Sequence, residues 1–178
     1  MNYSEFIKGY SYPTEMRGLS AKQIAAEMKC GWNLGNSFES ENNETYWGNP
    51  KTTKEMIDKI AGRGFTSLRV PVRWDNNYID SNYTIKNDYM NRIETVLNYG
   101  LSNNMYVIVN IHHNAIQTMV KPDLSIQKRT KDELSKVWTQ IATRFKNYGD
   151  KLIFEIINEP RLDENWDGDN GLYEILNV

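Results

Sequence analysis

The segment FEIINEP, residues 154 to 160, places an amide and a carboxylate directly after an apolar run. A carboxyl group at the end of a buried strand is placed to be desolvated, which would keep it protonated near neutral pH. Pro160 cannot continue a helix and therefore fixes the exit of the chain after Glu159. These features predict that Glu159 is a proton donor. The alternative is a glutamate that serves as a helix N-terminal charge or as an ion-pair partner.

Polar side chains also follow or end three earlier apolar runs, so four successive units repeat one pattern. In parallel α/β folds the carboxyl ends of the strands form the face that carries the site. We therefore expect the polar residues of the four units to gather at one edge of the sheet. Besides Asn158 and Glu159, these residues are Asn33, Asn36, Arg69, Arg73, His112 and His113.

The four runs predict strands, because each is almost continuously apolar, as is typical of parallel strands covered by helices. The strands are expected near residues 30–36, 66–72, 105–112 and 152–158, parallel and adjacent in chain order. A helical stretch precedes each run, and alternating helices and strands indicate an α/β architecture. Long loops are expected at residues 76–88 and after His113.

Helix starts are indicated by a serine or threonine followed three positions later by glutamate or glutamine, the pattern of a capping box. The pattern occurs at Ser20 with Gln23, Thr52 with Glu55, and Thr130 with Glu133. Another helix carries one apolar stripe and ends at Asn103 and Asn104; the stripe is formed by Met90, Ile93, Leu97 and Leu101. Gly149 is expected to end the last helix before its strand.

Composition fits one globular domain, because the 178 residues are 39% hydrophobic. A formal net charge of -2 gives no basic field, so nucleic acid is not an expected partner. Cys30, the single cysteine, is expected to be buried in the first strand and allows no disulfide. No run approaches the roughly 20 apolar residues that span a membrane. The N-terminus lacks the pattern of a signal peptide, which leaves an intracellular protein and a removed or replaced signal both open.

Five stretches in this order and spacing resemble glycoside hydrolase family 5, especially its fourth subfamily of bacterial endo-β-1,4-glucanases. They are GWNLGNSFE, ETYWGNPKTTKEMIDKI, GFTSLRVPVRW, VIVNIHHN and LIFEIINEPR. The resemblance extends from about Met16 onward. It implies a (β/α)8 barrel that cleaves β-linked glucans with retention of configuration. Residues 1–178 would then be the N-terminal half of the catalytic domain, about the first four βα units.

The resemblance also implies roles for individual residues. Glu159 would be the general acid/base, and Asn158 would contact the sugar 2-hydroxyl. The cleavage subsite would be lined by Arg69, His112 and His113, and the side of the non-reducing sugars by Trp47, Asn33 and Asn36. The family implies a β-glucan substrate, no cofactor, and secretion from the cell. Asn114 departs from the family pattern, in which an acidic residue commonly follows the two histidines.

Four residues have alternatives that the sequence itself raises. Glu155 has the same strand parity as Glu159 but is read as an interior ion-pair partner of Arg69. His112 and His113 could suggest a metal, but adjacent strand residues point to opposite faces and no further ligand cluster accompanies them, so no metal is expected. Trp47 is either core or an exposed indole suited to stacking on a sugar ring.

The chain supplies four strands, whereas a (β/α)8 barrel takes about 250 residues, and the family's nucleophile lies in the other half. We therefore expect a partner, either a C-terminal half-barrel chain or a second copy. Besides this incomplete endoglucanase, two functions stay open: a catalytically silent half-barrel that binds glucan, and a phosphate-handling α/β protein, for which no Gly-rich loop is found. If the lone chain were active, the nucleophile would be Asp75, Glu39, Asp163 or a second copy's Glu159.

Overall fold

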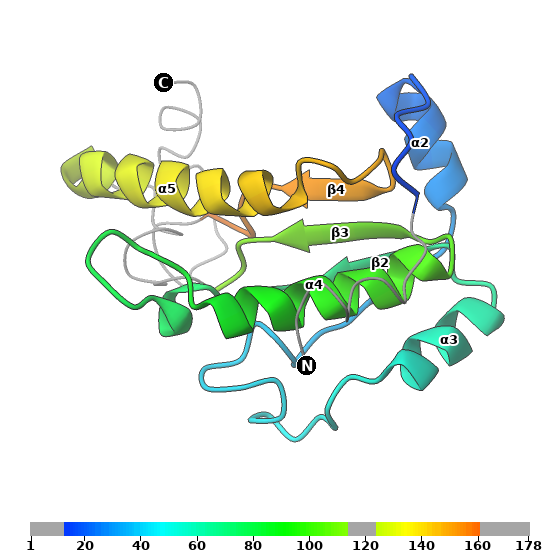
Figure 1. The fold of residues 1–178 in the computed structure, drawn as a ribbon, viewed down its shortest axis with the longest axis horizontal. Helices are drawn as coiled ribbons and strands as arrows, with labels where there is room; N and C mark the ends of the chain where they lie inside the picture. The colour runs from blue at the N-terminus through cyan, green and yellow to red at the C-terminus, as the bar shows by residue number, and fades with distance from the viewer. Residues whose placement is uncertain (1–12, 114–123, 161–178) are drawn as a thin grey trace, which may run out of the picture.

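The computed structural model describes residues 13–113 and 124–160 and contains one sheet of four parallel strands (Figure 1). The strands are β1 (Gly31–Asn33), β2 (Ser67–Val70), β3 (Tyr106–Asn110) and β4 (Leu152–Glu155). They pair in the order β1-β2-β3-β4, and every pair is parallel. The predicted strand positions, direction and order are confirmed, although each strand is shorter than its apolar run.

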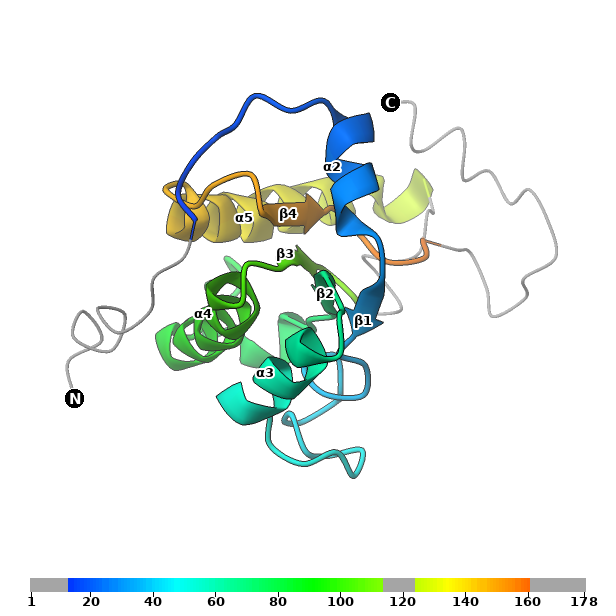
Figure 2. The same ribbon diagram turned by 90° about the vertical axis from the view of Figure 1, so that its right-hand side faces the viewer.

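Three of the helices cover one face of this sheet, as Figures 1 and 2 show together. They are α3 (Lys54–Gly62), α4 (Asn87–Ser102) and α5 (Gln127–Phe145). A further helix, α2 (Ala21–Met28), lies at the amino ends of the strands, and short 3-10 turns occupy Asp75–Asn77 and Leu124–Ile126. Within residues 13–113 and 124–160, no helix is both long and apolar enough to cross a membrane.

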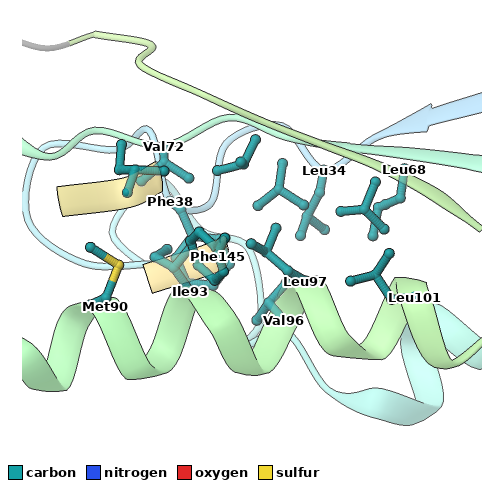
Figure 3. Packing of buried hydrophobic residues seen from close by; sticks show 14 of the residues in the cluster. Leu34, Phe38, Leu68, Val72, Met90, Ile93, Val96, Leu97, Leu101 and Phe145 are labelled. Carbon is teal, nitrogen blue, oxygen red and sulfur yellow. The ribbon is translucent and has the colours of Figure 1, made fainter. Parts of the chain in front are cut away.

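The hydrophobic core lies between the helices and the sheet. Figure 3 shows the predicted stripe of α4, with Leu97 and Leu101 directed toward Leu34 and Leu68 and with Ile93 beside Phe145. From α5, the core receives Val137, Ile141 and Phe145. Cys30 is exposed and precedes β1, so its predicted burial is wrong. The apolar run around it is longer than the part that pairs as a strand.

Two predicted helix starts need correction. The capping box of Ser20 and Gln23 is present at α2, as predicted. At α3, however, the side chain that caps is that of Thr53, which accepts from the backbone N–H of Met56, while Thr52 is buried. Adjacent threonines compete for the cap, and burial removes Thr52 from that competition.

The fourth helix begins earlier than the sequence predicts. Because α5 starts at Gln127, continuing the turn at Leu124–Ile126, Thr130 lies inside the helix. Glu133 is buried, and its carboxylate accepts a hydrogen bond from the Tyr78 hydroxyl at 3.1 Å. Burial raises the pKa of Glu133. The carboxylate of Glu133 is therefore committed to a loop contact rather than to the predicted cap.

The face of the sheet away from the helices carries polar residues. Strand register places Asn33 level with Arg69, and Asn110 level with Glu155. Since successive residues of a strand alternate between faces, Arg69 points away from the core that contains Leu68 and Val70. The polar face is thus set by strand parity within sequence runs that look uniformly apolar.

The amino ends of the strands are closed by the segment around Arg17. Its guanidinium pairs with Asp150 at 2.9 Å and with Glu27 at 2.9 Å, and donates to the Tyr106 hydroxyl at 2.5 Å. Gly149 donates its N–H to the Pro13 carbonyl at 3.1 Å. A Cβ on Gly149 would lie 2.5 Å from the backbone oxygen of Glu15. Gly149 is therefore required for close approach of two chain segments, whereas α5 already ends at Phe145.

Candidate active site

An ion pair organises the carboxyl ends of the strands. Arg69 of β2 donates to both carboxylate oxygens of Glu155 on β4, from Nε at 2.7 Å and from Nη2 at 2.5 Å. The predicted partnership of these two residues is confirmed. Partial burial opposes ionisation of Glu155, but hydrogen bonds from Arg69 and Asn110 outweigh it and hold the pKa of this carboxyl below its usual range. The hydrogen bond to Glu155 likewise raises the pKa of Arg69.

The same guanidinium contacts two more of the predicted site residues. Arg69 donates to the side-chain oxygen of Asn33 at 3.1 Å and to that of Asn158 at 2.9 Å. Asn158 is buried, and its backbone N–H donates to the Ile111 carbonyl at 2.8 Å, which continues the pairing of β3 and β4 beyond the strand ends. Residues from β1, β2 and the end of β4 are therefore held together by one planar cation.

Glu159 follows Asn158 at this end of the sheet. Its charge contributes, after Glu155, to the raised pKa of Arg69. The residue is exposed, so the desolvation expected of it is wrong for the described residues, because β4 ends at Glu155 and the apolar run does not enclose the chain after it. The backbone of Glu159 has φ of 41°, in the left-handed region that glutamate seldom adopts.

The two histidines lie against one another after β3. The ring centroids of His112 and His113 are 4.5 Å apart, with the planes at 76°. The expectation that they point to opposite faces is wrong, because β3 ends at Asn110 and strict alternation ends with it. Burial, with added charge effects of His113 and Arg69, lowers the pKa of His112 to about 4. His112 is therefore neutral at pH 7.

Trp47 lies beside the histidines and is open to solvent. Its ring centroid is 6.1 Å from that of His113, and the residue is 41% exposed, so the interpretation as core is wrong. Asn36 is exposed and has φ of 60° in a turn, where its backbone N–H donates to Glu39.

Other carboxylates near the site are committed elsewhere. Glu39 is 4% exposed and accepts from the backbone N–H groups of Asn36 and Ser37. Asp75 accepts from Arg73 Nε at 2.8 Å. Asp163, like Asn114, lies outside the described residues. Within residues 13–113 and 124–160, no three His, Cys, Asp or Glu side chains come together as metal ligands would.

The sequence gives no sign of one central residue, Asn110. Its side chain is fully buried and contacts both His112 and Glu155, at 3.0 and 3.1 Å. Asn110 ends the run YVIVN, where an amide reads as the end of a strand. Only the strand register, which places it opposite Glu155, reveals that it joins two parts of the site.

Comparison with known proteins gives consistent relatives. Residues 33–177 match the family model "Cellulase (glycosyl hydrolase family 5)". Endoglucanase B of Clostridium cellulovorans is 47% identical over 165 residues, which cover 90% of this chain and 37% of that protein.

Solved structures agree with that match. A broad-specificity endoglucanase from Clostridium cellulovorans superposes with a TM-score of 0.89 at 55% identity, covering 94% of this chain and 49% of that one. An endoglucanase from Ruminococcus champanellensis with bound cellotriose gives a TM-score of 0.82 at 41% identity, covering 88% of this chain and 48% of that one. The chain thus spans about half the length of these solved relatives, and its sheet and helices correspond to half of a (β/α)8 barrel.

Proposed function

Because the chain belongs to the cellulase family, glycosyl hydrolase family 5, we propose that it forms the N-terminal half of a retaining endo-β-1,4-glucanase domain. The observation that carries the proposal is the position of Glu159, directly after the Asn158 side chain that Arg69 holds at 2.9 Å. An exposed carboxyl beside a fixed amide suits a group that meets substrate. The relative with bound cellotriose supports a β-1,4-linked glucan as the ligand class.

In this proposal Glu159 is the general acid/base. In the first step it gives its proton to the glycosidic oxygen while the bond from that oxygen to the anomeric carbon breaks and a second carboxylate bonds to the same carbon. In the second step Glu159 takes a proton from the water that displaces this carboxylate. Asn158 contacts the sugar 2-hydroxyl throughout. Arg69 acts through Asn158, which it orients.

The second carboxylate is proposed to come from a complementary half. A retaining enzyme needs it about 5 to 5.5 Å from the acid. Glu155, Glu39 and Asp75 each already accept hydrogen bonds from an arginine or from the backbone. These commitments disfavour all three as nucleophiles.

The remaining predicted residues are assigned to substrate binding. His112 and His113 are assigned to the cleavage subsite together with Arg69, and the exposed indole of Trp47 is assigned to stacking on a sugar ring. Asn33, fixed by Arg69, and Asn36 are assigned to the side of the non-reducing sugars.

The partner is proposed to cover the open edges of the sheet. β1 and β4 each pair on one side only among the described strands. Trp32 beside one edge is 43% exposed, and Phe154 and Ile156 beside the other are 39% and 62% exposed. Unpaired edges with exposed apolar side chains favour association. A C-terminal half-barrel is the proposed occupant, and a second copy of this chain is the alternative.

The test is an assay of the purified chain on a soluble β-glucan and on an aryl cellobioside, alone and mixed with a C-terminal half that supplies the second glutamate. We expect almost no turnover by the chain alone and clear turnover by the mixture. In the mixture, Glu159→Gln should lower the rate on glucan by about 10²- to 10⁴-fold. The loss should be smaller on the aryl substrate, because its leaving group depends less on acid assistance.

The matched control is Glu41→Gln, which removes an exposed carboxylate outside the network and should leave the rate unchanged. Full turnover by the lone chain would contradict the half-site proposal. A Glu159→Gln mixture as active as the unchanged mixture would contradict the role of Glu159.

A silent half-barrel that binds glucan is the second candidate, and the exposed Trp47 favours it. Both functions predict weaker glucan binding after Trp47→Ala. Only the enzyme predicts turnover by the mixture, so the activity assay decides between them.

A further inference from the structure

Asn110, the last residue of β3, is the most enclosed polar side chain near the site. It is 0% exposed. Its side-chain oxygen accepts the backbone N–H of Val72 at 3.1 Å, and its side-chain nitrogen lies 3.0 Å from His112 Nδ1 and 3.1 Å from Glu155 Oε1. The backbone oxygen of Asn110 accepts the indole N–H of Trp74 at 2.9 Å. The amide is thus bound at every polar atom.

Only one orientation of this amide satisfies its neighbours. If the oxygen and nitrogen were exchanged, the NH2 group would face the N–H of Val72, donor against donor. The oxygen would face the carboxylate of Glu155, acceptor against acceptor. An NH2 group has two hydrogens to give. In the orientation that fits, one hydrogen goes to Glu155 and the other to Nδ1 of His112.

The contact between the Asn110 NH2 group and His112 Nδ1 determines which ring nitrogen of His112 is protonated. A ring nitrogen that accepts a hydrogen bond cannot be protonated, and in a neutral imidazole the proton then resides on the other nitrogen. Among the described residues, the charged and titratable groups that affect the ring are His113, Arg69 and Glu155, and the net effect of burial and these neighbours keeps the ring neutral at pH 7. In the described part of the chain, no hydrogen bond occupies Nε2 of His112.

We propose that Asn110 is a positioning residue that fixes His112 in the Nε2–H tautomer, so that the imidazole presents a hydrogen-bond donor to the site. Asn158 also presents a donor, because its side-chain oxygen accepts from Arg69 and its NH2 group is left to donate. Two fixed donors select a ligand that offers oxygen lone pairs, such as sugar hydroxyl oxygens. The identity of that ligand rests on the proposed function, whereas the tautomer of His112 does not.

The first test measures the tautomer directly in the full 178-residue chain without substrate. The chain has two histidines, so ¹⁵N labelling of histidine gives an NMR spectrum with two imidazoles. The spectrum of His113→Gln assigns the remaining ring to His112. At pH 7 we expect His112 to have a protonated Nε2 and an unprotonated Nδ1. A protonated Nδ1, alone or in an imidazolium, would overturn the proposal.

The second test changes the donor into an acceptor. Asn110→Asp keeps the size of the side chain and can still accept from Val72, but it offers an oxygen to His112 Nδ1. We expect a hydrogen to appear on Nδ1 of His112 at pH 7. An Nδ1 that stays unprotonated would show that Asn110 does not set the tautomer.

The matched control is Asn98→Asp, which places the same substitution at another buried amide, on α4. Both variants introduce a buried carboxyl, so both are expected to lower the melting temperature. Only Asn110→Asp should change the His112 signals. Equal changes in the two variants would identify a general structural effect and overturn the proposal. Because no readout involves turnover, failure here is distinct from failure of the proposed glucanase.

Discussion

Glu159 combines a functional side chain with an unfavourable backbone. Among the described residues, four other non-glycine positions also have positive φ, and two of them, Asn36 and Asn104, are of the type that tolerates this region. Glutamate has no such tolerance, and residues held in this way tend to cluster at functional sites. The conformation of Glu159 is therefore consistent with selection for where its carboxyl points.

This strain predicts the effect of two substitutions at one position. Relief of left-handed strain is worth about 1 to 2 kcal/mol, and the extra entropy of glycine in the unfolded chain costs about 0.5 to 1 kcal/mol. Glu159→Gly should therefore be more stable than Glu159→Ala by up to about 1.5 kcal/mol, measured by denaturant unfolding. Because both variants lack the carboxyl group, its loss does not affect the difference between them.

Glu55 in the first turn of α3 provides the control, because its backbone is helical. There the order should reverse, with the glycine variant less stable than the alanine variant. If the alanine variant were the more stable one at position 159 as well, Glu159 would be unstrained.

His112 makes stability depend on pH. In the folded chain its pKa falls from an ordinary value of 6.5 to about 4. Between these values the unfolded chain binds a proton that the folded chain does not, so stability should fall as pH drops from 6.5 toward 4. His112→Gln should remove this part of the slope in melting temperature against pH.

Glu155 contributes in a different range. Its folded pKa lies below 4.5, so its stabilising effect is lost only as pH falls below that value.

His113→Gln is the control for the histidine prediction. If it flattened the slope between pH 6.5 and 4 as much as His112→Gln does, the assignment to His112 would be wrong.

For individual residues, some contacts are predictable from the sequence and others are not. The partnership of Arg69 and Glu155 follows from strand parity, which is readable in the sequence. The role of Asn110 does not, because its three side-chain contacts come from three different segments of the chain and depend on register. The exposure of Glu159 is not predictable either, because the apolar run continues to residue 157 whereas β4 ends at Glu155.

At the scale of elements, two adjacent threonines at the start of helix α3 differ in exposure and in hydrogen bonding. Thr53 is exposed and its hydroxyl caps the helix. Thr52 is 2% exposed, and its hydroxyl has no hydrogen-bond partner among the described residues. Helix existence was predictable from the apolar stripe, but the identity of the cap was not, because both threonines fit the pattern.

Replacing each threonine by valine tests this difference. Thr53→Val should lower the free energy of unfolding by about 1 kcal/mol through loss of the cap. Thr52→Val should leave it unchanged or raise it, because a buried hydroxyl without a partner is itself unfavourable. Denaturant melts of the two variants check the prediction. A larger loss for Thr52→Val would restore Thr52 as the cap.

At the scale of the whole molecule, the contact between residues 13–17 and 149–150 joins two distant parts of the chain. Gly149→Ala should be strongly destabilising, because the added Cβ would meet backbone rather than a movable side chain. Gly62→Ala, in α3 with nothing within 4 Å of the added Cβ, should instead stabilise by about 0.5 to 1 kcal/mol. Thermal melts of both variants provide the check, and a neutral Gly149→Ala would show that the segments can separate freely.

The sheet order was predictable at this scale, since each helix and strand follows the last in a repeating unit. The closure by Arg17 was not, because nothing in the sequence near Arg17 identifies Asp150 as its partner. Contacts of that kind follow from the geometry of the completed sheet.

The Arg17 to Asp150 ion pair also sets an order of events during synthesis. The two residues are 133 positions apart. At about 5 to 20 residues per second, a ribosome needs roughly 7 to 27 s to make the intervening chain. Helices form within about a microsecond, whereas parallel strands pair more slowly because their contacts are non-local. On the ribosome, the contact of Arg17 with Asp150 therefore forms only after β1, β2 and β3 have been made, whereas its contacts with Glu27 and Tyr106 can form earlier.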